Sequence, residues 1–298
     1  METFVLTPLS DHIPDVVTTQ NMLAALSNIT ENKMPDLKVT LIQSQLQWED
    51  KAANLRMFDE KIAAISERTE VVVLPEMFST GFSMKSKELA ETMDGSAVEW
   101  MKKTAAEKNI IITGSLIIND NGRYVNRLIW MQPNGVYGTY DKRHLFAYAG
   151  EHEHYQSGDK RLIAQVKGWK VCLNVCYDLR FPVWARNAVL PETGEPAYDL
   201  LVYVANWPER RKTAWTTLLQ ARAIENQCYV IGVNRVGNDG NNIYHSGESS
   251  LIDPMGEIIY RKSDEEDIFS YTLDRNRLDE VRKNIPFLKD ADQFILNS

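Results

Sequence analysis

The regular alternation of strand-like and helix-like segments from residue 37 onward is the feature that most constrains the fold. The runs "LKVTLIQ" (37–43) and "EVVVLPE" (70–76) are apolar and rich in β-branched residues, as strands are. The charged stretch between them carries apolar residues at the spacing of one helix face: Leu55, Phe58, Ile62 and Ile65. This strand-helix-strand opening is typical of α/β proteins.

The rest of the chain is rich in strands. Residues 96–109 predict a further helix, with Ser96 as its N-cap and Glu99 completing a capping box. The turn-rich loop "NDNGR" (119–123) between two apolar runs predicts a hairpin. In total we expect about a dozen strands and roughly four or five long helices, too many strands for one doubly wound sheet. The predicted fold class is α/β, a single-domain, four-layer α-β-β-α sandwich with helices outside two stacked sheets.

This pattern also sets the expected domain boundaries, with the domain itself at residues 37–275. Residues 1–36 lack the basic start and uninterrupted apolar run of a signal peptide. We expect them to be a poorly ordered N-terminal extension, with Met34 as an alternative natural start. Residues 276–298 are expected to be a C-terminal tail that packs on a partner subunit.

Composition and charge exclude several classes of protein. The chain has 298 residues, 44% of them hydrophobic and 25% charged, and a mean hydropathy of -0.34, as in globular domains. Its formal net charge of -8 argues against a nucleic-acid or anionic-membrane partner, because those surfaces need concentrated Lys and Arg. No apolar run is long enough to span a bilayer. We expect a cytoplasmic protein whose partners are a small molecule and copies of itself.

Three cysteines favour free thiols in a reducing compartment. Cys172 and Cys176 lie too far apart on one extended run to form a disulfide with each other. Cys172 and Cys228 are interpreted as small core residues. Cys176 differs from both, because it ends its strand-like run directly before the polar pair Tyr177-Asp178.

Two other apolar runs also end in a reactive or ionisable group, Glu76 and Lys142. The carboxyl ends of strands line the ligand crevice in open α/β sheets, so we expect both side chains to converge with Cys176. Each residue alone has a simpler interpretation, as a solvated carboxylate, a surface lysine and a packed thiol. Their occurrence together favours a site.

The three residue types together suit acyl transfer. A cysteine attacks as the thiolate, which a neighbouring ammonium such as that of Lys142 stabilises. Glu76 is suited to accept the thiol proton and later a proton from water. Lys142 and the backbone N–H of Tyr177 are suited to hold a developing oxyanion. This chemistry needs no histidine.

These stretches resemble the nitrilase superfamily of carbon-nitrogen hydrolases, which use a Glu-Lys-Cys triad. Over residues 37–275 the likeness lies in the order and spacing of "LPEMF" with Glu76, "YDKRHLF" with Lys142 and "VCYDLRFP" with Cys176. The resemblance implies the four-layer fold, no metal or organic cofactor, a thioester intermediate, and a homodimer or higher homo-oligomer.

Further stretches resemble the omega-amidase branch of that superfamily: "LPEMFSTGFS", "ANWPERRKTAWTTLLQARAIENQ" and "GVNRVGNDG". That likeness implies hydrolysis of the terminal carboxamide of a 2-oxo dicarboxylic acid monoamide, such as 2-oxoglutaramate or 2-oxosuccinamate, to the dicarboxylate and ammonia. The alternative is another amidase or carbamoylase of the superfamily, because the triad sets the reaction and the pocket walls choose the substrate.

The superfamily also carries a second glutamate that contacts the catalytic lysine, in the loop after the lysine motif and before a glycine. Here "FAYAGEHEHYQSG" offers Glu151 and Glu153, and the spacing from Gly158 favours Glu151 as the fourth catalytic residue. The simpler interpretation is that both carboxylates are solvated on a loop.

The pocket walls are less constrained by the sequence. Asn206 and Trp207 follow a strand, so we expect them to line the crevice and bind substrate together with Tyr177, although Trp207 is equally suited to the core. A dicarboxylate monoamide needs a cation for its distal carboxylate. Four arginines are candidates that the sequence does not rank: Arg180, Arg210, Arg211 and Arg235.

Two further classes of function stay open. His152 and His154, with His144 or His245, would be ligands in a metal-dependent hydrolase, but no third motif of recognised ligand spacing accompanies them. A non-catalytic protein that binds a partner is the other class. It has no need for Glu, Lys and Cys at strand ends.

Overall fold

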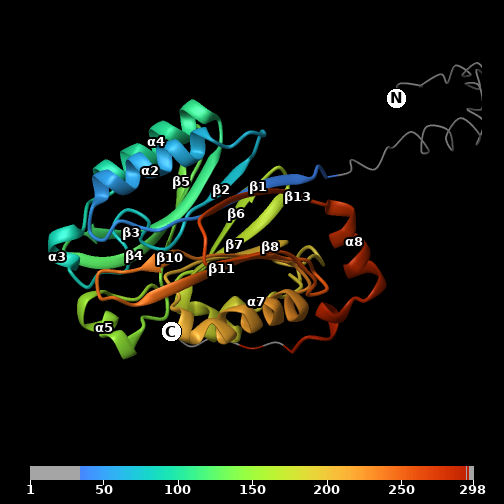
Figure 1. The fold of residues 1–298 in the computed structure, drawn as a ribbon. Coiled ribbons are helices and arrows are strands. Elements are labelled where there is room, and N and C mark those ends of the chain that lie inside the picture. The colour runs from blue at the N-terminus through green and yellow to red at the C-terminus, as the bar shows by residue number, and fades with distance from the viewer. Residues whose placement is uncertain (1–33, 293, 295–298) are drawn as a thin grey trace, which may run out of the picture. The chain divides into compact units, whose positions relative to one another are not determined.

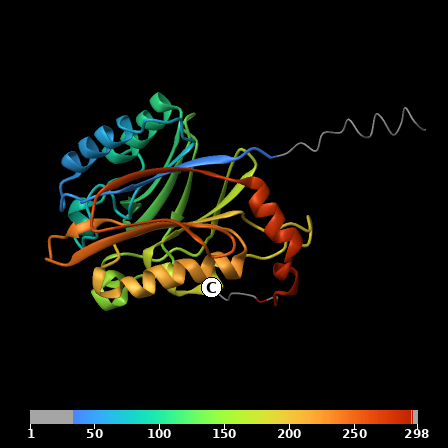
Figure 2. The same ribbon diagram turned by 45° about the vertical axis from the view of Figure 1, so that its right-hand side comes forward.

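The computed structural model describes residues 34–292 and 294. The expected N-terminal extension therefore lies almost entirely outside the described residues. Figures 1 and 2 show two stacked sheets with helices α2 and α4 outside one sheet and α7 outside the other. The predicted four-layer sandwich is confirmed. None of the described helices is long and apolar enough to cross a membrane.

The first sheet has six strands. In spatial order they are β13 (Asp267–Leu273), β1 (Leu37–Gln43), β2 (Val71–Val73), β3 (Ile111–Asp120), β4 (Arg123–Met131) and β5 (Tyr137–Asp141). Strands β1, β2 and β3 are parallel, and the other pairs are antiparallel. The predicted hairpin joins β3 to β4, where Asn121 and Gly122 adopt φ values of 55° and 88°. Such positive φ values match the tight turns of hairpins.

The second sheet has seven strands. They are β10 (Val236–Asn238), β11 (Tyr244–Ile252), β9 (Tyr229–Val233), β8 (Leu200–Val204), β7 (Trp169–Val175) and β6 (Leu162–Val166), with β12 (Ile258–Ser263) paired to β11. Strands β7, β8 and β9 are parallel. The main covering helices of the two sheets are α2 (Lys51–Ala63), α4 (Ser96–Lys108) and α7 (Lys212–Asn226). Shorter helices are α3 (Ser86–Leu89), α5 (Glu151–His154), α6 (Pro182–Ala185) and α8 (Arg275–Asn284).

The apolar strands are buried on both faces, which explains their unbroken hydrophobic runs. In β2, Val71 and Val73 belong to the cluster that contains the second sheet and α7. Val72, between them, belongs to the cluster that contains Phe58 of α2 and Met101 of α4. Successive side chains of one strand therefore fill two different cores.

The cap of α4 differs from the prediction. Gly95 is the N-cap, and Ser96 is already the first helical residue, so no serine capping box forms. Glu91 takes that role instead, because its carboxylate accepts the backbone N–H groups of Ala97 (2.8 Å) and Val98 (3.0 Å). A carboxylate at the positive end of a helix is favourable whichever residue supplies it.

Helix α8 occupies part of the predicted C-terminal tail. Arg282 donates to Asp199 Oδ1 (2.6 Å) at the start of β8, and Arg275 lies 3.2 Å from Asp199 Oδ2. Asp199 is buried, so these ion pairs hold α8 on the second sheet. Packing of the following residues on a partner subunit stays a prediction.

Candidate active site

The three predicted strand-end residues follow strands of both sheets. Glu76 comes shortly after β2, Lys142 directly after β5, and Cys176 directly after β7. Lys142 and Glu76 are both 0% exposed, and the Lys142 Nζ donates to Glu76 Oε1 at 2.9 Å. A buried ammonium therefore lies directly against a buried carboxylate at the seam between the sheets.

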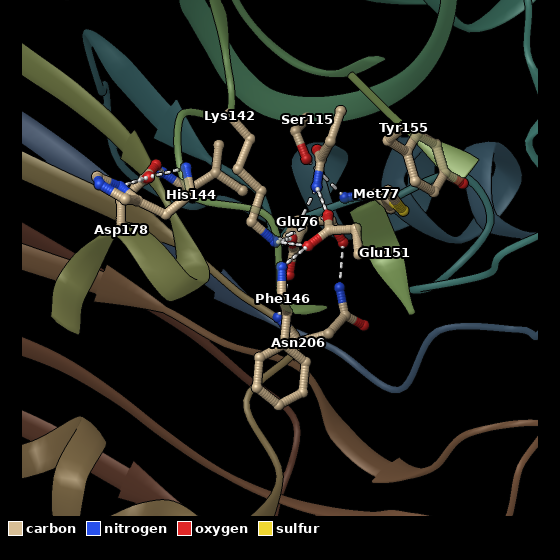
Figure 3. Close-up of polar contacts among 12 residues, drawn as sticks. Glu76, Met77, Ser115, Lys142, His144, Phe146, Glu151, Tyr155, Asp178 and Asn206 are labelled. Carbon is tan, nitrogen blue, oxygen red and sulfur yellow. Dashed lines mark hydrogen bonds and ion pairs between the residues drawn. The ribbon is translucent and has the colours of Figure 1, made fainter. Parts of the chain in front are cut away.

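A second carboxylate also contacts this lysine. Glu151, the first residue of α5, accepts hydrogen bonds from Lys142 Nζ at 3.0 Å and 2.9 Å through its two oxygens. The backbone N–H of Phe146 donates to Glu151 Oε2 at 2.5 Å. Figure 3 shows the lysine ammonium between Glu76 and Glu151. Glu153 is exposed, so of the two glutamates weighed from the sequence it is Glu151 that lies on Lys142.

Gly158, the glycine whose spacing favoured Glu151, is required at its position by a close backbone contact. The Gly158 N–H donates to the Lys142 carbonyl at 3.0 Å, which brings this segment close to the end of β5. A β-carbon on Gly158 would collide with the Asp141 carbonyl. Only glycine permits this approach.

The charges in this cluster oppose one another. Burial alone lowers the pKa of Lys142, but the charges of Glu151 and Glu76 outweigh burial and raise that pKa. Burial raises the pKa of Glu151 and the charge of Lys142 lowers it, but burial together with the repulsion from Glu76 leaves that pKa raised. The site thus encloses one ammonium group between two carboxyl groups.

Cys176 has an unusual backbone. Its φ of 46° lies in the left-handed region, which costs a residue with a β-carbon about 1–2 kcal/mol. Asp178 holds this turn, because its Oδ2 accepts the Val175 N–H (3.0 Å) and the Tyr140 hydroxyl (2.7 Å). Asp178 Oδ1 accepts the His144 backbone N–H at 2.9 Å and lies 2.8 Å from His144 Nδ1. The turn after the cysteine is thereby tied to the segment after Lys142.

The surroundings of Cys176 favour the protonated thiol over the thiolate. Burial raises the pKa of Cys176, the charge of Glu76 raises it further, and the opposing charge of Lys142 does not restore it, so this pKa lies well above its ordinary value. A thiol in this state becomes a nucleophile only when a base removes its proton. Glu76 is a carboxylate whose charge acts on that thiol.

A cavity of about 280 Å³ opens onto Cys176. Cys176 lines it, whereas Glu76 and Lys142 lie behind the lining. Tyr177, Asn206 and Trp207, the residues predicted to bind substrate, all line the cavity. Trp207 also packs in the core, with its ring centroid 5.4 Å from that of Trp215, so it lies both in the core and in the cavity wall, and its contact with substrate stays a prediction.

The four arginines that are candidates for binding the distal carboxylate differ in whether they reach the cavity. Arg180, Arg210 and Arg211 line the cavity. Arg235 does not belong to the lining; it is fully buried and donates to the Asn238 carbonyl at 2.8 Å. The sequence contains no signal for this distinction, because each arginine follows a strand or a turn near the crevice.

Asn126 is a part of the site that the sequence reasoning missed. Its Nδ2 donates to Glu76 Oε1 at 2.8 Å and lies 3.4 Å from Glu151 Oε1, so it links the two carboxylates. The signal was a lone asparagine inside the apolar run of β4. Asn206, which was expected only in the wall, also holds the glutamate: its backbone N–H donates to Glu76 Oε2 (2.8 Å) and its Nδ2 to the Glu76 carbonyl (2.6 Å).

The histidines of the metal alternative lie in different settings. His144 faces Asp178, and His152 and His154 are exposed on α5. His245 is buried, which lowers its pKa to about 4, and its Nδ1 lies 2.9 Å from the Ile243 carbonyl oxygen. Within residues 34–292 and 294, no group of three or more His, Cys, Asp or Glu side chains is arranged to hold a metal ion.

Comparison with known proteins gives consistent matches over most of the chain. The omega-amidase YafV of Escherichia coli (strain K12) is 45% identical over 264 residues, which are 88% of this chain and 100% of that protein. The 2-oxoglutaramate amidase of Bacillus subtilis (strain 168) is 32% identical, covering 85% of this chain and 96% of that protein.

Solved structures agree with the fold. XC1258 from Xanthomonas campestris, described as a CN-hydrolase superfamily protein with an arsenic adduct in the active site, has a TM-score of 0.87. It is 41% identical, over 89% of this chain and 100% of that chain. Nit3 of Saccharomyces cerevisiae, a nitrilase-superfamily member, has a TM-score of 0.74 at 27% identity, over 84% of this chain and 94% of that chain. The carbon-nitrogen hydrolase profile matches residues 38–283. The resemblance seen in the sequence is confirmed: this chain belongs to the carbon-nitrogen hydrolase family, within the nitrilase superfamily.

Proposed function

We propose that this protein is an omega-amidase that hydrolyses the terminal carboxamide of a 2-oxo dicarboxylic acid monoamide to the dicarboxylate and ammonia. The observation that carries the proposal is the buried Lys142, bonded to Glu76 and Glu151 behind a cavity lined by Cys176. The relatives named omega-amidase and 2-oxoglutaramate amidase support the choice of substrate class.

In the first half-reaction Glu76 takes the proton of the Cys176 thiol, and the sulfur attacks the carboxamide carbon. The carbonyl oxygen becomes an oxyanion, which the Lys142 ammonium and the backbone N–H of Tyr177 stabilise. Protonated Glu76 then returns its proton to the nitrogen, the C–N bond breaks, and ammonia leaves. The acyl group remains on Cys176 as a thioester.

In the second half-reaction water replaces ammonia. Glu76 removes a proton from that water, and the hydroxide attacks the thioester carbon. The C–S bond breaks, and the thiolate recovers the proton from Glu76. Glu151 touches neither sulfur nor water in this scheme; it fixes Lys142 and supplies the negative charge that keeps its ammonium protonated.

We also propose a cytoplasmic homodimer. All three cysteines are free and buried, which suits a reducing compartment. The net charge of -8 makes nucleic acids and anionic membranes poor partners. The mass of the purified protein in solution tests the dimer.

A panel of amides tests the substrate class. The purified protein is assayed with 2-oxoglutaramate, 2-oxosuccinamate, glutamine, asparagine, a carbamoyl amino acid and a nitrile. We expect one of the 2-oxo monoamides to give the highest kcat/KM. A carbamoyl amino acid at the top of the order would favour the carbamoylase alternative, and glutamine or asparagine at the top would favour another amidase. Intact-mass detection of an acyl adduct that disappears in Cys176→Ala would establish the thioester.

A further inference from the structure

Three guanidinium groups gather on one wall of the cavity without anionic partners. Arg180, Arg210 and Arg211 all line the same cavity as Cys176. None of their side chains forms an ion pair or donates a hydrogen bond to any residue that the structure describes. Some other arginines do have anionic partners: Arg127 lies 2.8 Å from Asp120, and Arg277 lies 2.8 Å from Asp253.

This gathering of like charges is unfavourable in the unliganded protein. Burial lowers the pKa of Arg211, and the charges of Arg210 and then Arg180 lower it further. The chain as a whole carries a net charge of -8, so the cationic wall stands out from an acidic protein. An anion bound among the three groups would remove the repulsion.

Aromatic rings fix the positions of two of these groups. The guanidinium carbon of Arg211 lies 4.9 Å from the ring centroid of Phe146, and that of Arg180 lies 5.0 Å from the ring centroid of Trp207. Trp207 in turn donates its indole N–H to the Arg211 carbonyl at 2.8 Å. Such stacking holds a guanidinium by its face and leaves its N–H groups free for a carboxylate.

The acidic residue on the cavity wall does not neutralise the arginines. Asp239 is the one carboxylate among the described lining residues. Its Oδ1 accepts hydrogen bonds from the backbone N–H groups of Asn241 (2.8 Å) and Ile243 (2.9 Å). This carboxylate therefore stabilises the loop that contains it.

The position of Arg211 relative to the nucleophile is also informative. It is half-buried, whereas Arg180 and Arg210 are exposed. Its charge interacts with Cys176, and it stacks on Phe146, whose backbone N–H holds Glu151. Arg211 is therefore the inner member of the group, and the other two lie nearer to solvent.

We infer that Arg211 binds the substrate carboxylate distal to the scissile carboxamide, and that Arg180 and Arg210 attract the anion toward the cavity. This inference rests on the proposed function, because it takes Cys176 as the group that attacks the amide. The cavity then selects amides that carry an anion at the far end of a short chain, and it disfavours neutral amides.

The test compares two amides that differ only in that charge. 2-Oxoglutaramate carries the carboxylate, and 4-oxopentanamide has a methyl group in its place. In Arg211→Gln, kcat/KM for 2-oxoglutaramate should fall about 10- to 100-fold more than for 4-oxopentanamide, the range for losing charge-assisted hydrogen bonds. Arg56→Gln, which removes an exposed arginine of α2, is the matched control and should change neither value. Equal losses for the two amides in Arg211→Gln would overturn the inference.

Salt separates the outer arginines from the inner one. For the unmodified protein, kcat/KM for 2-oxoglutaramate should decline as salt increases, because exposed charges are screened. In the double variant Arg180→Gln/Arg210→Gln that decline should be much weaker. An unaltered salt dependence would contradict the steering role.

A binding measurement tests the anion site independently of the proposed omega-amidase activity. The dicarboxylate 2-oxoglutarate is titrated into Cys176→Ala protein by calorimetry, with and without Arg211→Gln. Binding that needs Arg211 supports the anion site even if the protein hydrolyses neither amide, an outcome that would refute the omega-amidase proposal alone. Binding that is absent, or equally strong without Arg211, would overturn the anion site.

Discussion

Replacing Lys142 by methionine should leave two carboxylates without their cation in the interior. The ammonium of Lys142 is 0% exposed and bonds to Glu76 at 2.9 Å and to Glu151 at 2.9 Å and 3.0 Å. Methionine has a similar length and fills the same space. The substitution therefore tests charge rather than packing.

The expected loss of stability is large. Removing one partner of a buried ion pair typically costs about 3–5 kcal/mol. For a chain of this size each kcal/mol lowers Tm by about 2–4 °C, so Tm should fall by about 6–20 °C. Activity should fall at least about 100- to 1000-fold, as when one oxyanion donor is removed.

The loss of stability should depend on pH. Without the lysine, burial and the repulsion from Glu76 hold the carboxyl pKa of Glu151 above that of the unfolded chain. A carboxyl whose pKa is raised on folding costs no stability below its unfolded pKa of about 4.3, and it destabilises the fold progressively as pH rises from that value to the raised pKa. Lys142→Met should therefore be closest to the unmodified protein near pH 5 and furthest from it near pH 8. Thermal unfolding at the two pH values measures this difference.

Double variants identify the carboxylate responsible. Adding Glu151→Gln to Lys142→Met removes one buried charge and should recover about 1–3 kcal/mol at pH 8. Adding Glu153→Gln is the matched control, and it should recover nothing because Glu153 is exposed. The reasoning is refuted if Lys142→Met unfolds at the same temperature as the unmodified protein at pH 8, or if the two double variants behave alike.

Three further substitutions test the roles around the nucleophile. Cys176→Ala should remove nearly all turnover while Cys172→Ala retains most of it, because only Cys176 lines the cavity; comparable steady-state rates for the two would contradict the assignment. Glu76→Gln cannot accept a proton and should block thioester formation, so single-turnover mass spectrometry should find no acyl adduct, and a normal adduct would refute the base. His144→Phe keeps the stacking on the neighbouring ring but loses the side-chain bond to Asp178 (2.8 Å), so kcat should fall about tenfold with little change in KM; a change in KM alone would argue against a positioning role.

The sequence was most informative where the structure is local. The hairpin after β3 and the strands were predictable because turn residues and apolar runs act within a few positions. The cap of α4 was not predictable in this way, because Glu91 belongs to the preceding loop and binds the N–H groups that were assigned to Ser96. Asn126 was missed for a related reason: its role depends on the placement of β4, which brings it to Glu76 and Glu151.

The sequence predicts the three strand ends in the crevice of one open sheet, but the structure places them on two different sheets. In an open sheet the crevice lies along one edge, at the ends of neighbouring strands. Here Glu76 and Lys142 end strands of the first sheet, and Cys176 ends a strand of the second. Two sheets closing over the same point exclude water from the ionic groups, which an open crevice would not do. The strained turn at Cys176 then brings this residue to the cavity wall, where the proposed mechanism needs its sulfur, while Glu76 and Lys142 stay buried.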